Sequence, residues 1–362
     1  MSRILIGVAN LLQSIRGELM TSLDETTVIA LRGWHPAISR AEARAMFPEC
    51  VISQNESRRL IIAEGDSDWT RAEIMAGCEC VLVGGGIAEW TSIEDLHKLI
   101  EYQKMADMAV ECWRHEGKLP VSTKEIEHQL GGRFHDEGST FNLGNPTHRF
   151  GVVLDASAGL VAWGWMVGPG PGKHGWASMR ANKRPFFRPV SLEPRLARAA
   201  VNIAAGINEG YVVDPMCGTG GILIESALTN RQTLGIDFDP VMVEGTKENL
   251  EWAGVKAEVR RDDATRFQLP QKLAALVVDP PYGRNSKGDE KLLEEMLANV
   301  VAQHNECRLV IILPGKAGNE NLDQAIETEF KLPGFKVEES YGIPVHKSLG
   351  RTLIIASIST QD

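Results

Sequence analysis

Strand and helix patterns alternate in the C-terminal half of the chain, and this alternation constrains the fold more than any other feature. Apolar segments typical of strands occur at Tyr211–Asp214, Thr233–Asp237, Ala257–Arg260, Ala275–Asp279, Cys307–Leu313, Lys336–Tyr341 and Thr352–Ile358. Helical patterns occur at Leu192–Ala205, Gly221–Asn230, Pro240–Ala253, Glu290–His304 and Leu322–Glu329. This alternation predicts an α/β fold with a doubly wound sheet. No helix pattern separates the last two strands, so we expect an antiparallel hairpin at one edge.

One of these strands ends in a motif that carries chemistry. The apolar run 276–278 reads as a buried parallel strand that stops at Asp279. Pro280 and Pro281 follow, and neither can donate a hydrogen bond to a neighbouring strand, so the strand must end there. The Asp279 carboxylate, free backbone carbonyls and the ring of Tyr282 together suit a planar group that carries an –NH2. The alternative is a Pro-Pro turn whose tyrosine packs into the core.

Acidic residues also follow three other strands of the predicted sheet. Asp214 precedes a glycine-containing loop, Asp237 lies about twenty residues further on, and a third acidic pair is Asp262-Asp263. Ligands of such sheets lie at the carboxyl ends of the strands, where an acid commonly binds a ribose diol. The glycine spacing matches neither the dinucleotide fingerprint nor the P-loop, which disfavours a nicotinamide dehydrogenase. Each acid alone is equally explained as a turn or a helix cap.

Taken together, these acids fit an adenosine whose attached group is positively charged, and S-adenosylmethionine is such a ligand. Asp279 lies at the same predicted sheet edge and is included in this site. The expected cofactor-binding residues are Asp214, Pro215, Cys217, Gly218, Thr219, Gly220, Asp237, Phe238, Asp262, Asp263, Ala264 and Asp279.

Composition and charge restrict the class of protein. No apolar run approaches the ~20 residues that cross a bilayer, and six scattered cysteines favour reduced thiols in a cytoplasmic protein. The net charge of −10 argues against non-specific polyanion binding. Basic residues nevertheless concentrate between residues 173 and 198, where Lys183, Arg184 and Arg188 are candidate phosphate contacts. The alternatives are a solvated connector and, for the two arginines, structural ion pairs.

The N-terminal half shows shorter α and β patterns. We expect strands at Val28–Leu31 and Arg59–Ala63, and a helix that Ser39 caps with Glu42 at the capping-box spacing. Further helices are expected at Trp69–Gly77, at Ile93–Cys112, and at Thr123–Leu130 with Gly131-Gly132 as its stop. Strands are expected at Phe150–Leu154 and Val161–Val167. The Gly-Pro run at residues 168–172 predicts a loop and a domain boundary.

Four segments together resemble a known family. They are Arg184–Pro189, Asp214–Gly221, Gly235–Pro240 and Asp279–Gly283. They look like the archaeal tRNA guanine-N2 methyltransferases that modify guanosine 10, and like the catalytic subunit of the eukaryotic counterpart. In that family a ferredoxin-like domain and a THUMP RNA-binding domain precede a Rossmann-like methyltransferase domain. The Gly- and Trp-rich tract before Arg184 departs from the charged sequence expected there.

The resemblance implies a division of the chain and a set of roles. It implies an N-terminal extension at 1–26, a ferredoxin-like domain at 27–86, a THUMP-like domain at 87–172, a basic linker at 173–190 and a Rossmann-like methyltransferase domain at 191–362. By this resemblance the catalytic residues would be Asp279, Pro280, Pro281 and Tyr282. Asp279 and the Pro280 carbonyl would accept hydrogen bonds from the guanine 2-amino group, and Tyr282 would stack on the flipped base. Asp214, Gly218 and Gly220 would contact the methionine moiety, Asp237 the ribose and Asp263 the adenine.

The predicted function is therefore methyl transfer from S-adenosylmethionine to a guanosine of tRNA, most directly guanosine 10. The alternatives are another tRNA guanosine, the 6-amino group of adenine in DNA, and a non-catalytic RNA-binding subunit. The predicted partners are tRNA and, as the eukaryotic relative implies, a small zinc-binding activator protein; neither a membrane nor a bound metal is expected. One or two transferred methyl groups are equally compatible with the sequence. Cys217 is expected to be a packed loop residue, because this chemistry needs no covalent intermediate.

Overall fold

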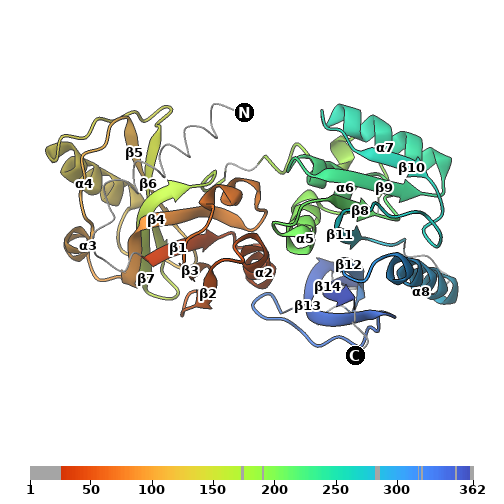
Figure 1. Cartoon of the computed structure of the whole chain (residues 1–362). Coiled ribbons are helices and arrows are strands. Elements are labelled where there is room, and N and C mark those ends of the chain that lie inside the picture. Colours follow the sequence, from red (N-terminus) through yellow and green to blue (C-terminus); the bar gives the residue numbers. More distant parts are fainter. Residues whose placement is uncertain are drawn as a thin grey trace. The chain divides into compact units, whose positions relative to one another are not determined.

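A computed structural model describes residues 26–172, 175–189, 191–281, 286–316, 318, 321–346 and 349–358, with only the backbone of 286–289 and 346 (Figure 1). Two compact units form within it. The first comprises the described residues up to Pro36, Phe47–Ile74, and those from Cys78 to residue 172. The second comprises Ala37–Met46, Met75–Gly77 and the described residues from Gly175 onward. The extension predicted at 1–26 lies outside the described residues except for residue 26.

The second unit contains a seven-stranded sheet in the order β10-β9-β8-β11-β12-β14-β13. The strands are β8 (Tyr211–Asp214), β9 (Gln232–Asp237), β10 (Glu258–Arg261), β11 (Leu273–Val278), β12 (Arg308–Gly315), β13 (Phe335–His346) and β14 (Leu349–Ile358). The first five run parallel, whereas β14 is antiparallel to both β12 and β13. The doubly wound sheet and its antiparallel hairpin are thus confirmed. The strand order reverses at β8 and β11, and such a reversal is where these sheets bind ligands.

One helix precedes the first strand of this sheet, and three helices connect successive parallel strands, namely β8 to β9, β9 to β10 and β11 to β12. They are α5 (Pro194–Ala205), α6 (Gly221–Ala227), α7 (Pro240–Trp252) and α8 (Ser286–Gln303). The helix predicted at Leu322–Glu329 is wrong. The Ile326 amide donates to the Ser340 carbonyl at 2.8 Å, and the Ser340 hydroxyl donates back to the Ile326 carbonyl. Bonds to β13 therefore replace the internal bonds that a helix would need.

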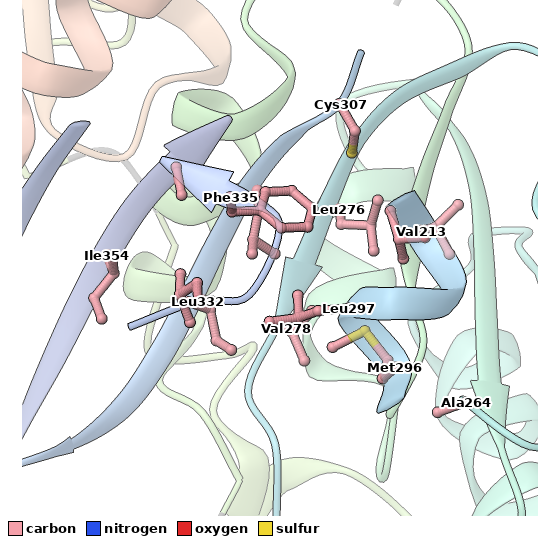
Figure 2. Packing of buried hydrophobic residues seen from close by; sticks show 14 of the residues in the cluster. Val213, Ala264, Leu276, Val278, Met296, Leu297, Cys307, Leu332, Phe335 and Ile354 are labelled. Carbon is pink, nitrogen blue, oxygen red and sulfur yellow. The ribbon is translucent and has the colours of Figure 1, made fainter. Parts of the chain in front are cut away.

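A hydrophobic cluster fixes the central strands of the second unit (Figure 2). Leu276 and Val278 of β11 are fully buried, as are Met296 and Leu297 of α8. Ile354 extends the same cluster to β14. Because removing a buried Leu, Ile or Met side chain typically costs about 2–5 kcal/mol, this packing holds the end of β11 firmly in place.

One further helix, α2 (Pro36–Met46), belongs to the second unit by its contacts. It begins at Pro36, so Ser39 is not its N-cap and the predicted capping box is wrong. The buried Glu42 carboxylate instead accepts hydrogen bonds from the amides of Ala76 and Gly77, at 2.8 and 2.6 Å, and from the side chain of Asn202 at 2.7 Å. Burial raises the pKa of Glu42, although these hydrogen bonds oppose the shift.

The first unit also has a seven-stranded sheet, in the order β2-β3-β1-β4-β7-β6-β5. Its strands are β1 (Thr26–Leu31), β2 (Val51–Gln54), β3 (Leu60–Glu64), β4 (Cys78–Glu89), β5 (Met108–Arg114), β6 (His148–Asp155) and β7 (Leu160–Val167). All neighbours are antiparallel except β5 and β6. β4 runs through residue 86, where the sequence predicts a boundary. The ferredoxin-like and THUMP-like division stays a prediction.

Three helix predictions in the first unit need correction. The pattern at Ile93–Cys112 is the short helix α3 (Ile93–Leu99) followed by β5, because β5 pairs with β6. Helix α4 (Thr123–Asp136) continues through Gly131-Gly132, since Leu130 and Phe134 on either side are fully buried. That burial outweighs the ~1 kcal/mol that a glycine costs inside a helix. The helix expected at Trp69–Gly77 is a 3-10 helix at Trp69–Ile74.

Candidate active site

The carboxyl ends of three neighbouring strands bring three acids to one sheet edge. Asp214 is the last residue of β8, Asp237 is the last residue of β9, and Asp279 follows β11 directly. Burial raises the pKa of Asp214 well above its usual value, and the charges of Asp279 and Asp237 add to that rise. The three predicted site acids therefore lie close enough to interact electrostatically.

The loop after β8 is held in a shape that depends on glycine. Gly218 and Gly220 have φ angles of +51° and +78°. A Cβ atom on Gly220 would lie 2.7 Å from Cγ2 of Thr246, whereas one on Gly218 would meet nothing within 4 Å. The Gly218 amide donates to Asp237 at 3.0 Å, and its carbonyl accepts from the Thr246 hydroxyl at 2.6 Å. The loop is fixed on one side and open at Gly218 on the other.

The remaining loop residues mostly pack inward. Pro215 is buried, and the Thr219 hydroxyl lies 3.0 Å from the Ser191 hydroxyl. Cys217 is buried against Gly235, where an added Cβ would lie 3.1 Å from its Sγ. Burial raises the pKa of the Cys217 thiol well above its usual value. A neutral, packed thiol of this kind is a poor nucleophile.

Asp237 and Phe238 present different groups at the end of β9. The Asp237 carboxylate is half-buried and also accepts from the Asp239 amide at 2.9 Å. The Phe238 ring is 75% exposed, which leaves an apolar face available beside the acids.

The acidic pair after β10 is already engaged in a turn. Asp263 accepts from the amide and hydroxyl of Thr265 at 2.9 and 2.8 Å and forms an ion pair with Arg266. Asp262 is exposed and accepts from the Asp263 amide, while Ala264 is buried. The turn alternative for Asp263 thus applies in this structure, and its role towards adenine stays a prediction.

Asp279 makes an ion pair that sequence reasoning missed. Nη1 of Arg351 lies 3.2 and 3.4 Å from the two Asp279 carboxylate oxygens. Burial raises the pKa of Asp279 to about 6, although Arg351 opposes the rise. Pro280 is buried and Pro281 exposed, while Tyr282 lies outside the described residues. The available sequence signal was a single charged residue, this arginine, in β14.

The three candidate phosphate contacts differ in exposure. Lys183 and Arg188 are exposed, and the Arg188 guanidinium stacks 4.7 Å from the Phe186 ring centroid. Arg184 is only 4% exposed and donates to the Met179 carbonyl at 3.3 Å. Among the described residues, its Nε and Nη1 atoms have no hydrogen-bond partner. This placement favours a structural role for Arg184 over contact with phosphate.

Known proteins similar to this chain carry consistent names. A family model described as "RMKL-like, methyltransferase domain" matches residues 181–339. A protein of Methanothermobacter thermautotrophicus, named tRNA (guanine(10)-N2)-dimethyltransferase, is 39% identical over 180 residues, covering 48% of this chain and 51% of the relative. A Pyrococcus abyssi protein of the same name is 35% identical over 240 residues, covering 64% of this chain and 68% of the relative.

A mammalian protein also matches. The mouse tRNA (guanine(10)-N(2))-methyltransferase TRMT11 is 29% identical over 128 residues, covering 29% of this chain and 28% of the relative. The aligned part thus spans about half of the Methanothermobacter relative and about two thirds of the Pyrococcus relative. Among the described residues, no helix is long and apolar enough to cross a membrane.

Proposed function

Because this chain belongs to the family of the archaeal tRNA (guanine(10)-N2)-dimethyltransferases, we propose that it methylates the 2-amino group of a guanosine in tRNA. The proposed donor is S-adenosylmethionine and the proposed target is guanosine 10. The observation that carries this proposal is the meeting of Asp279 with Asp214 and its glycine loop where the strand order reverses. Asp279, which would accept a hydrogen bond from the amino group, therefore lies beside Asp214, which would bind the cationic methyl donor.

The residues at this edge suit S-adenosylmethionine. Asp214 is buried, and a buried carboxylate gains most from a cationic partner. No atom would obstruct a Cβ at Gly218, so a ligand can approach the backbone there. Asp237 would hold the ribose hydroxyls, and the exposed Phe238 ring would cover the adenine. When bound, S-adenosylmethionine supplies an electrophilic methyl group on a sulfonium.

Asp279 has two tasks in the proposed reaction. Its carboxylate accepts a hydrogen bond from the guanine 2-amino group, which orients the nitrogen lone pair towards the methyl group. A C–S bond breaks as an N–C bond forms, and the extra proton on the nitrogen passes to a carboxylate oxygen of Asp279. The Pro280 carbonyl is the second proposed acceptor, and Tyr282 is proposed to stack on the base. Cys217 takes no part.

The rest of the chain would bind the RNA. We propose that the first unit recognises folded tRNA by its shape and phosphates, as structured-RNA binders do. The exposed Lys183 and Arg188 are proposed phosphate contacts of the linker. The proposed site of action is the cytoplasm. The second proposed partner is a small zinc-binding activator protein.

The test is methyl transfer to defined transcripts. The protein is incubated with labelled S-adenosylmethionine and unmodified tRNA carrying either guanosine or adenosine at position 10. We expect label only on the guanosine transcript, and loss of label with Asp279→Ala. The exposed Glu248→Gln on α7 is the matched control and should stay active. Mass spectrometry of the nucleosides counts the methyl groups, and two are expected from the relatives' names.

The other outcomes discriminate the alternatives. Label on the adenosine-10 transcript that Asp279→Ala abolishes would move the target to another guanosine. Label on adenine of DNA would replace the substrate. If calorimetry detects no binding of S-adenosylmethionine or of its demethylated product, a non-catalytic RNA-binding subunit becomes the better hypothesis.

A further inference from the structure

We propose that Arg351 is a positioning residue that keeps the Asp279 carboxylate ionised and oriented towards the substrate amino group. This inference rests on the proposed function, because it assigns Arg351 a part in the same reaction. It starts from a contact between β14 and the end of β11, which lie 72 residues apart in sequence. No feature of the motif around Asp279 predicts that contact.

The sheet brings the arginine to the site. Strand β12 lies between β11 and β14, and Arg351 is in register with Pro314 of β12. The Arg351 side chain therefore crosses β12 to reach Asp279. A Cβ on Gly315 would lie only 2.9 Å from the Arg351 carbonyl carbon, so glycine permits close approach of the two strands there. Both side chains of the pair are shielded, with 16% of Arg351 and 15% of Asp279 exposed.

The contact leaves the carboxylate able to act. One guanidinium nitrogen, Nη1, lies within 3.4 Å of both Asp279 oxygens. A carboxylate has about four lone-pair sites. One nitrogen shared between the two oxygens therefore leaves acceptor capacity on each oxygen for an amino group.

The charges around Asp279 explain why a cation is needed. Among the described residues, Arg351 faces it from β14, and the charge of Asp279 in turn acts on Asp214 of β8. Asp237 of β9 adds a third carboxylate to the group. Leu313 and Pro314 at the end of the intervening β12 carry no charge. Burial favours a protonated Asp279, and Arg351 opposes it through its charge and its hydrogen bonds.

A protonated Asp279 would fail in the proposed reaction, because it cannot take the proton that the methylated amine must lose. Methyl transfer should therefore decline as the pH falls through the pKa of Asp279. A purely structural Arg351 would change the amount of folded protein but not the pH at which this decline occurs. The pH at which this decline occurs, which is the acid limb of the pH profile, thus distinguishes a positioning role from a purely structural role.

The experiment compares Arg351→Gln and Arg351→Lys with the wild type. An opposite charge within about 4–6 Å lowers a carboxyl pKa by roughly 1–3 units. We therefore expect Arg351→Gln to move the acid limb of methyl transfer upward by about 1–3 pH units. Arg351→Lys keeps the positive charge and should leave the acid limb close to its wild-type position. The control is Arg308→Gln at the opposite end of β12, whose partner Glu338 lies 3.4 Å away, and it should leave the limb unmoved.

A second measurement is independent of RNA and of activity. The Asp279 carboxyl is titrated by carbon NMR in protein with labelled aspartate, and its signal is assigned by its loss in Asp279→Asn. An upward shift of the Asp279 pKa in Arg351→Gln supports the proposal, and an unchanged pKa and acid limb overturn it. A wild type that transfers no methyl group refutes the proposed function instead, while the NMR titration still decides whether Arg351 controls the ionisation of Asp279.

Discussion

Replacing Asp279 by asparagine should stabilise the protein while abolishing its activity. The pKa of this carboxyl rises from 3.8 to about 6 in the folded chain, chiefly because the group is buried. A carboxyl whose pKa is raised in the folded state contributes stability at pH values below its unfolded-state pKa. That contribution is lost as the pH rises through the folded-state pKa. Each unit corresponds to about 1.4 kcal/mol, so ionised Asp279 costs the wild type about 3 kcal/mol above pH 6. Asparagine keeps the shape of the side chain and removes this cost.

The assay is thermal and urea unfolding of wild type and Asp279→Asn without cofactor, at pH 4 and pH 8. For a unit of this size, about 3 kcal/mol corresponds to a rise of roughly 6–12 °C in the melting temperature. We expect the gain at pH 8 and little difference at pH 4, where Asp279 is protonated in the folded protein and only partly ionised in the unfolded chain. Glu248→Gln, which removes an exposed carboxylate from α7, should show no such pH-dependent gain.

A result in the opposite direction would refute the reasoning. If Asp279→Asn were less stable than the wild type at pH 8, then the ion pair with Arg351 would outweigh the cost of burial. Equal stability at both pH values would mean that Asp279 titrates in the folded protein as it does in the unfolded chain.

Three further changes test the site. Gly220→Ala should lower stability by about 1–3 kcal/mol in urea unfolding, because it forces a side chain into the φ angle of +78° and against Thr246. Asp214→Asn should weaken cofactor binding in calorimetry and flatten its pH dependence; in the wild type affinity should rise with pH, since burial raises the Asp214 pKa and only the ionised form pairs with a cation. Cys217→Ala should keep its methyl-transfer rate, because the buried thiol is not a nucleophile.

The sequence predicted the parts of the fold that depend on local patterns. Apolar runs of strand length separated by helical patterns predicted the doubly wound sheet, and the structure brings three of the expected acids together, namely Asp214, Asp237 and Asp279. The errors occurred where distant partners decide. Residues 108–114 are a strand because β6 pairs with them, and Ile326 bonds to Ser340 instead of forming a helix. The sequence of each segment alone does not identify its distant partner.

The same separation explains why the sequence yields Asp279 but not Arg351. The proposed catalytic acid precedes two prolines and so has a local signature, whereas Arg351, its proposed positioning residue, is contributed by a strand that lies two positions away in the sheet. Burial makes Asp279 costly to ionise, and the same burial strengthens its interaction with any cation nearby. An arginine across β12 and a cationic methyl donor would both lower that cost. The ionised forms of these acids are therefore most costly without a bound donor and gain most when a cationic donor binds, so we expect cofactor affinity to be coupled to the ionisation of the proposed catalytic group.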